Sequence, residues 1–209
     1  MSDILRFTIL GCGSSPGVPR ITGDWGACDP TNPKNRRLRS SMLVERIRPT
    51  GEKTIVVIDT GPDFRQQMVN AGVRRVDAVV YTHAHADHIH GIDDLRTFVL
   101  ATQTRAQVYA DQRTLNILTS SFNYIFERQK DSDYPPIADC HCIETGKDFT
   151  ITGKGGTITL TPFGLQHGPL RIKGFRIGGL AYCTDVSGFP EKTLPLVTGV
   201  EVLIIGALQ

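Results

Sequence analysis

Short apolar runs, separated by turn-forming residues, divide the chain into predicted strands. Runs that alternate apolar and polar side chains, or that are apolar throughout, are typical of strands buried on one face or on both. This pattern predicts strands at residues 7–11, 41–45, 53–59, 76–82, 106–110, 156–167, 171–179, 180–185 and 200–206. The run VDAVVYT at 76–82 is almost continuously apolar, which indicates burial on both faces.

Apolar residues at helical spacing predict helices between these strands. The first lies within residues 61–72, where Pro62 suits a first helical turn and Gly72 suits a helix end. Further helices are expected at 93–103, 112–128 and, as a short element, 190–197. Strands and helices alternate in the first half and strands follow one another in the second, so we expect an α/β fold. A mixed sheet and two packed sheets both remain open.

One long segment shows no periodicity. Residues 11–37 are dense in Gly, Pro, Asp and Asn, so we expect a loop between the first two strands. A loop of this length in a compact domain is usually functional or mobile.

The size and charge of the chain narrow its class. Its 209 residues suffice for one domain, which we expect to span residues 1–209. A net charge of +2 is close to balanced, so nucleic acid is not an expected partner. No apolar run reaches the roughly 18 residues of a membrane span, so no membrane partner is expected either. The oligomeric state stays open, with a homodimer among the possibilities.

The N-terminus and the cysteines bear on location. MSDILRFTILGCG is typical of a first strand rather than a signal peptide, which favours the cytoplasm and reduced thiols. The five cysteines form no CxxC pair. The cluster DCHC at 139–142 has a spacing that is unusual for a structural zinc site.

Four of the six histidines lie in one stretch, YTHAHADHIHG at 81–91. His83 and His85 are two residues apart, so an extended backbone points both imidazoles to the same side. Asp87 and His88 follow where the chain turns into a helix, and they point toward a second ion. His and Asp suit zinc and related divalent ions. We therefore favour half of a metal site over a solvated turn that happens to be rich in histidine.

Two further candidate ligands end predicted strands. His167 precedes a Gly-Pro turn, and Asp185 closes the run LAYCTD. Taken singly, either residue could be a capping histidine or a turn aspartate. Together with the stretch at 81–91, they favour a set of metal ligands.

These motifs resemble a known family. THAHADHIHG is similar to the T-H-x-H-x-D-H signature of the metallo-β-lactamase superfamily, and VVIDTGPDFRQQM, LQHG and YCTD resemble its other motifs in order. LGCGSSPGVPR and NRRLRSSMLVE resemble the branch of phosphoribosyl cyclic phosphodiesterase-like enzymes, and the tRNase Z enzymes share parts of that opening.

The resemblance implies a fold and a ligand set. The fold would be an αββα four-layer sandwich that binds two divalent ions, Zn2+ or Mn2+. His83, His85 and His167 would hold one ion, and Asp87 and His88 would hold the other. Asp185 would bridge the two ions. Asp59 would orient a ligand without touching metal, or it would be an ordinary turn residue.

The chain departs from the family pattern in two places. The region of the structural zinc loop offers only Cys28, so no structural zinc is expected. The superfamily supplies a last histidine ligand after the final strands, whereas no histidine follows His167 here. We therefore expect a domain that is incomplete at its C-terminus, with its final elements missing and its second metal weakly bound.

The resemblance also implies a reaction. A hydroxide that bridges the metals would attack phosphorus, so Ser14 and Ser15 are expected to be loop residues rather than nucleophiles. Asp87 and His90 are the candidate catalytic residues, with His90 as a proton donor or an ordinary helix histidine. The candidates for binding substrate phosphate are Arg20, Arg36 and Arg37, which could equally be solvated surface charges.

Several functions fit these expectations. The leading hypothesis is a metal-dependent phosphodiesterase that acts on a small cyclic phosphate or nucleotide. An RNA-processing nuclease of the tRNase Z type is the alternative, and a thiolesterase of the glyoxalase II type fits the opening motif less well. A metal-binding remnant with little activity is the competing hypothesis outside the enzymes.

Overall fold

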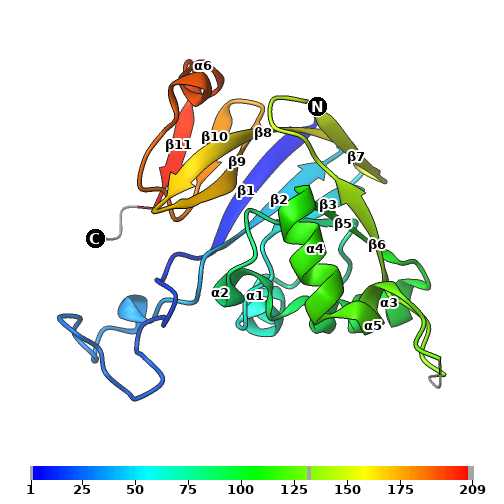
Figure 1. The fold of residues 1–209 in the computed structure, drawn as a ribbon, viewed down its shortest axis with the longest axis horizontal. Coiled ribbons are helices and arrows are strands. Elements are labelled where there is room, and N and C mark those ends of the chain that lie inside the picture. Colours follow the sequence, from blue (N-terminus) through cyan, green and yellow to red (C-terminus); the bar gives the residue numbers. More distant parts are fainter. Residues whose placement is uncertain (1, 131–132, 207–209) are drawn as a thin grey trace.

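The computed structural model describes residues 2–130 and 133–206, and it contains two β-sheets (Figure 1). The first sheet has six strands in the order β1-β2-β3-β4-β5-β6. Strands β1 to β3 are antiparallel, and β3 to β6 are parallel. Their bounds are Ile4–Gly11, Ser41–Ile47, Lys53–Ile58, Ala78–Val80, Ala106–Ala110 and Ala138–Cys142.

The second sheet comes from the C-terminal half of the chain. Its five strands have the order β11-β10-β9-β8-β7, antiparallel except for the parallel pair β10 and β11. Their bounds are Phe149–Gly153, Gly156–His167, Leu170–Ile177, Leu180–Cys183 and Val202–Ile205. The α/β prediction is confirmed, and the two-sheet arrangement is the one that forms.

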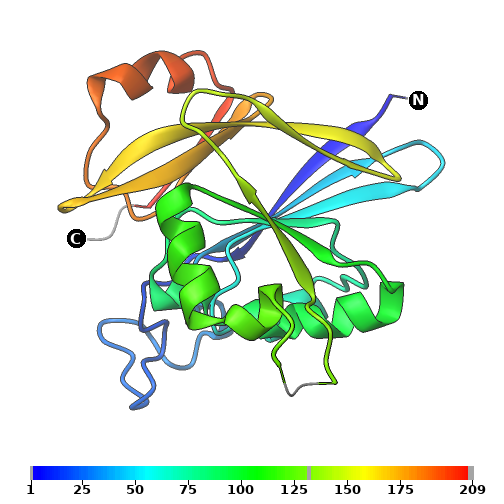
Figure 2. The ribbon, with the colours of Figure 1, turned by 45° about the vertical axis from the view of Figure 1, so that its right-hand side comes forward.

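Helices cover the outer faces of both sheets (Figure 2). Five lie over the first sheet, namely α1 to α5, and α6 (Leu194–Val197) lies over the second. The bounds of the five are Phe64–Asn70, Ala86–Ile89, Leu95–Thr102, Gln112–Ser121 and Asn123–Phe126. Short 3-10 turns stand at Pro33–Asn35, Ile92–Asp94 and Glu191–Thr193. This is the expected αββα sandwich.

The core follows these layers. One apolar cluster fills the space between the helices and the first sheet, one lies between the two sheets, and a third lies under α6. Strand β4 packs into two of these clusters, which explains why its sequence is almost continuously apolar. Val79 packs in the cluster on the helix side, and Ala78 and Val80 pack between the sheets. All three residues are fully buried.

The structure differs from the predicted elements in one helix and two strands. The helix expected at 112–128 is interrupted at Phe122, whose backbone leaves the helical region and separates α4 from α5. Strands β6 and β7 were not predicted. In β6, ADCHC, polar side chains hide the strand pattern because this strand lies at the sheet edge, where two of its five residues are exposed.

The loop predicted at 11–37 is confirmed as largely irregular, and it projects away from the sandwich (Figure 1). Local contacts hold its shape. Asp24 accepts hydrogen bonds from the Arg20 guanidinium and from the backbone of Gly26, and the Arg36 guanidinium lies 5.3 Å from the centre of the Trp25 ring.

Within the described parts of the chain, no helix has the length and apolar character needed to cross a bilayer.

Candidate metal centre

The ends of four strands bring the predicted ligands and Asp59 together. Asp59 follows β3 directly, and His83 lies three residues after β4. His167 is the last residue of β8, and Asp185 lies two residues after β10. Loops at the ends of strands are where α/β folds usually place their sites, because the backbone is free to turn side chains inward there. The centre therefore takes residues from both sheets.

The ligand atoms form two groups that share one residue. Within each group, the candidate atoms lie within 4.8 Å of one another. The first group is His83, His85, His167 and Asp185, and the second is Asp87, His88 and Asp185. The shared carboxylate is the one for which the sequence predicts a bridging position. The structure thus brings all six predicted ligands to one place, and their binding of metal remains a prediction.

His83 gives a direct test of whether these residues suit a cation. Its Nδ1 lies 3.0 Å from the Thr82 hydroxyl, whereas its buried Nε2 has no hydrogen-bond partner among the described residues. Burial, with the charge of His88 next in weight, lowers the pKa of His83 to about 3. The ring is therefore neutral at pH 7, and its Nε2 offers a lone pair toward Asp185, whose Oδ2 is 3.5 Å away. This buried, unpaired acceptor fits a metal ligand.

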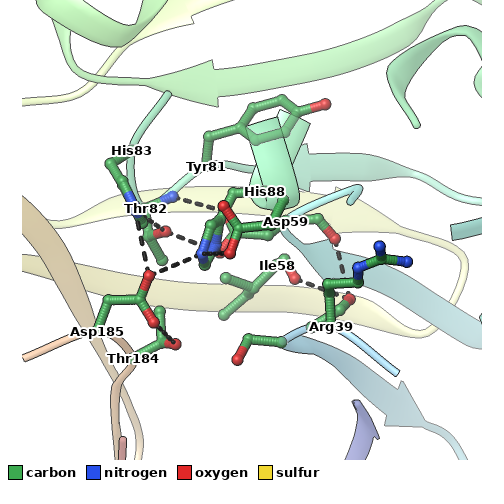
Figure 3. Close-up of polar contacts among 12 residues, drawn as sticks. Arg39, Ile58, Asp59, Tyr81, Thr82, His83, His88, Thr184 and Asp185 are labelled. Atoms are coloured by element: carbon green, nitrogen blue, oxygen red, sulfur yellow. Dashed lines mark hydrogen bonds and ion pairs between the residues drawn. The ribbon is translucent and has the colours of Figure 1, made fainter. Parts of the chain in front are cut away.

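His88 is oriented by a carboxylate behind it. Its Nδ1 lies 2.7 Å from Oδ2 of Asp59, and its Nε2 lies 2.9 Å from Oδ2 of Asp185 (Figure 3). Asp59 is fully buried and also accepts hydrogen bonds from the backbone and the hydroxyl of Thr82, at 2.8 and 2.7 Å. A carboxylate that accepts the Nδ1 proton leaves Nε2 free as a ligand atom. Asp59 is thus both a turn residue, with φ of 63°, and a partner of His88.

The charges around His88 favour a cation. Burial alone would lower its pKa, but Asp59, Asp185 and Asp87 together raise the pKa of His88 well above its usual range. Burial opposes ionisation of Asp185, yet the hydrogen bond and charge of His88 still lower its pKa. Burial also raises the pKa of Asp59 against the pull of His88. A positive charge is therefore favoured between His88 and Asp185, and a divalent ion would supply one.

A cavity of about 420 Å³ opens beside the ligands. Its lining includes His85, Asp87, His167 and Asp185, and also residues 14–16, Ser40 and 204–206. Its size is in the range of sites for small molecules.

Ser14 and Ser15 are therefore more than the simple loop residues that the sequence suggested. They lie in the loop, and they also form part of the cavity wall. Ser15 and Asp87 both line the cavity, and a hydrogen bond from the Ser15 side chain is among the causes that lower the pKa of Asp87. Burial opposes ionisation of Asp87, but His88 and then Ser15 hold the pKa of Asp87 well below its usual range. The sequence gives no signal that places these serines beside the histidine stretch, because about 70 residues separate the two segments.

The structure does not bring the three predicted arginines to the cavity. Arg20 pairs with Asp24 in the projecting loop, and Arg36 stacks on Trp25. The backbone of Arg37 pairs with Val18. All three residues are exposed and none lines the cavity, so their predicted role in binding phosphate finds no support in their position. Arg39, which was not among the predicted site residues, donates a hydrogen bond to the carbonyl of Ser15 in the cavity wall.

His90 is also away from the ligands. It follows α2, whose turn leaves its side chain exposed with its ring 5.9 Å from that of Phe122. Its predicted role as a proton donor therefore lacks the required proximity. Among the described residues, His141 is remote as well, because it stacks on Tyr109 and its Nε2 lies 2.7 Å from Gln107 Oε1.

The sandwich and its two ligand groups are those of a known class of proteins. The family model for the beta-lactamase superfamily domain matches residues 54–209. The chain therefore belongs to the beta-lactamase superfamily, as its sequence motifs predicted.

Within this superfamily, the chain is similar to a crystal structure described as a new diphosphatase from the PhnP family. The two share 34% sequence identity with a TM-score of 0.80, over 96% of this chain and 73% of that one.

Two curated relatives are longer. An octanoyltransferase from Porphyromonas gingivalis is 31% identical over 205 residues, which cover 98% of this chain and 39% of the relative. The exodeoxyribonuclease WalJ from Streptococcus pneumoniae is 30% identical over 101 residues, which cover 47% of this chain and 30% of the relative. The chain spans less than half the length of the curated relatives it matches.

Proposed function

We propose that this chain carries a two-metal hydrolase centre that cleaves phosphodiesters, with a small cyclic phosphate or nucleotide as substrate. The observation that carries the proposal is the sharing of Asp185 by two groups of ligand atoms. A carboxylate that belongs to two neighbouring groups of ligand atoms is placed to contact two ions that lie a few ångström apart.

The two groups differ in chemistry, and this bears on the metals. The first has three histidines and one carboxylate, which suits Zn2+. The second has two carboxylates and one histidine, which suits harder ions such as Mn2+ as well. Because the second group has fewer ligands, we expect it to bind its ion more weakly. We therefore propose two divalent ions of unequal affinity.

The residues of the chain have distinct roles in this proposal. When bound, the ions polarise a phosphoryl oxygen and lower the pKa of a coordinated water. His83, His85 and His167 fix the first position, and the neutral ring of His83 keeps its lone pair available at pH 7. Asp59 holds His88 in the tautomer that exposes Nε2. The cavity beside Asp87 gives room for a small phosphodiester.

The similarity to the PhnP-family diphosphatase supports phosphate-ester chemistry over thioester cleavage. That protein is a diphosphatase by its description, and the 34% identity covers almost all of this chain. The identity of the substrate itself is part of our proposal.

A nuclease is the second candidate, because the exodeoxyribonuclease WalJ is 30% identical over about half of this chain. The two candidates differ in the size of the substrate. A phosphodiesterase for small molecules should cleave cyclic nucleotides faster than single-stranded DNA or precursor tRNA, and a nuclease should show the opposite order.

Turnover of bis(p-nitrophenyl) phosphate tests the proposal. The protein would be freed of metal with a chelator and reloaded with Zn2+ or Mn2+, and we expect activity only after reloading. Asp185→Asn keeps the size of the side chain but removes its charge, so we expect about a 100-fold or greater loss of turnover. Asp148→Asn is the control, because Asp148 is a carboxylate that accepts a hydrogen bond from Thr161 on an exposed strand pair. Full activity in Asp185→Asn would refute the two-metal proposal.

A further inference from the structure

Arg39 joins three segments next to the centre. Its Nη1 donates to Oδ1 of Asp63 at 2.8 Å, and its backbone N–H donates to Oδ2 of the same residue at 2.8 Å. Its Nε donates to the carbonyl of Ser15 at 3.1 Å. The side chains of Arg39 and Asp63 are only 26% and 17% exposed. This pair is thus more shielded than a surface ion pair, and its geometry is better defined.

The Ser15 carbonyl belongs to a tight turn in the cavity wall. The Gly17 N–H donates to the carbonyl of Ser14 at 2.8 Å, and Gly17 has a positive φ of 71°, which a side chain would strain. Ser14, Ser15 and Pro16 all line the cavity. Arg39 therefore holds the carbonyl of Ser15, and Ser15 lines the same cavity as Asp87, to which its side chain is a hydrogen-bond partner.

The backbone around this turn leaves little room for adjustment. A Cβ on Gly61 would lie 2.0 Å from the carbonyl oxygen of Asp87, and a Cβ on Gly11 would lie 2.1 Å from that of Arg39. The same Arg39 carbonyl accepts a hydrogen bond from Nε2 of Gln67 at 2.8 Å. In the view of Figure 3, Arg39 lies on the opposite side of Asp59 from Asp185. Gly61 packs against the segments that carry Arg39 and Asp87, because its added Cβ would also lie 3.7 Å from Cβ of Arg39.

We propose that Arg39 is a positioning residue for the ligand carboxylate of Asp87, and that it acts through the Ser14–Gly17 turn. This inference rests on the proposed two-metal function. A guanidinium can bond to a carboxylate and a carbonyl at once, because its donors lie in one plane and point in different directions. The turn is thereby fixed to α1 through Asp63, and the Ser15 hydroxyl restricts the orientation of the Asp87 carboxylate.

The prediction is specific to one of the two groups of ligands. Asp87 belongs only to the second group, with His88 and Asp185. Partners that orient a ligand without touching the ion typically change metal affinity by about 10- to 100-fold. Loss of the Arg39 guanidinium should therefore weaken the second ion about tenfold and leave the first nearly unchanged.

The test uses the full chain, freed of metal and titrated with Mn2+ into the millimolar range, with electron paramagnetic resonance reporting free Mn2+. The test variants are Arg39→Met, Ser15→Ala and the double variant. Arg46→Met is a matched control, because Arg46 also bonds to one carboxylate, Asp3, and one carbonyl, Thr157, but lies at the other end of the sheet. We expect the weaker Mn2+ site to lose about tenfold in affinity in Arg39→Met and Ser15→Ala, and to be unchanged in Arg46→Met.

The double variant separates positioning from general support. If Arg39 acts through Ser15, the double variant should lose no more affinity than the worse single variant. Additive losses, or equal weakening of both Mn2+ sites in Arg39→Met, would overturn the inference. Because Ser15→Ala changes only a hydroxyl on a turn, it tests the same link if Arg39→Met folds poorly. A native chain that binds no Mn2+ would refute the proposed function as well, whereas two sites unchanged in both single variants would refute this inference alone.

Discussion

At the scale of single residues, the centre depends on which nitrogen of each histidine carries the proton. Asp59 lies 2.7 Å from Nδ1 of His88, and Thr82 places its hydroxyl 3.0 Å from Nδ1 of His83. In both rings Nε2 is the atom that faces Asp185. The sequence could predict the histidines from their spacing. The resemblance implied that Asp59 orients a ligand, but the sequence could not predict which histidine it contacts, because Asp59 and His88 come together only when two parallel strands pair.

The first prediction concerns Asp59. In Asp59→Asn, the amide can keep the bond from the Thr82 N–H and tolerates the positive φ, but its NH2 group would face Nδ1 of His88. His88 would then carry its proton on Nε2 and lose its ligand lone pair. We expect Mn2+ or Zn2+ at the second group to bind about 10- to 100-fold more weakly, measured by calorimetry.

Asp77→Asn is the control for this prediction. Asp77 also accepts a backbone hydrogen bond, from Ile55 at 2.7 Å, and pairs with Arg75 at the far end of the sheet. This variant should be less stable but should keep its metal affinity. Equal metal affinity in Asp59→Asn and the native protein would show that Asp59 is only a turn residue.

At the scale of elements, burial decides what the sequence could reveal. The buried strand β4 shows as a continuous apolar run, and β8 matches its predicted range of 156–167. Strand β6 was missed because polar residues dominate this exposed edge strand. Strand β7, FTITG, alternates apolar and polar residues, but over only five positions, and this short pattern was overlooked. The interruption of 112–128 at Phe122 carries no proline or glycine signal. Ligands at strand ends were predictable, whereas the cavity wall and Arg39 depend on contacts between distant segments.

A prediction at this scale concerns the junction after α2. Gly91 packs so closely that an added Cβ would lie 2.2 Å from the carbonyl oxygen of Gly61 and 2.7 Å from Cβ of Phe64. Gly91→Ala should therefore push the histidine stretch away from β3 and cost about 1–3 kcal/mol of stability. Thermal unfolding with and without Mn2+ measures both stability and metal binding.

Gly164→Ala is the matched control, since nothing lies within 4 Å of an added Cβ there. The melting temperature of this variant should stay close to that of the native protein. An unchanged melting temperature in Gly91→Ala would contradict the close packing that fixes this junction.

At the scale of the whole molecule, the centre connects the two sheets. His83, His85, Asp87 and His88 follow β4 of the first sheet, whereas His167 and Asp185 come from β8 and β10 of the second. A bound ion would therefore link the two layers. The sequence indicated the sandwich through its motifs, but the pattern of apolar residues alone left one mixed sheet open.

Metal binding should thus stabilise the whole sandwich. An ion present at about 100 times its dissociation constant adds about 2.7 kcal/mol, which for a chain of this length raises the melting temperature by about 5–10 °C. We expect this rise on adding Zn2+ to the metal-free protein. In His167→Ala the rise should be much smaller, because the second sheet then contributes only Asp185. A rise of the native size in that variant would argue that the ion does not bridge the sheets.

The central claim is that two ions share Asp185, and anomalous X-ray scattering from crystals soaked in Mn2+ tests it most directly. We predict two anomalous peaks within ligand distance of the Asp185 carboxylate. One should be bound by His83, His85 and His167, and the other by Asp87 and His88. A single peak, or two peaks of which only one contacts Asp185, would contradict the account.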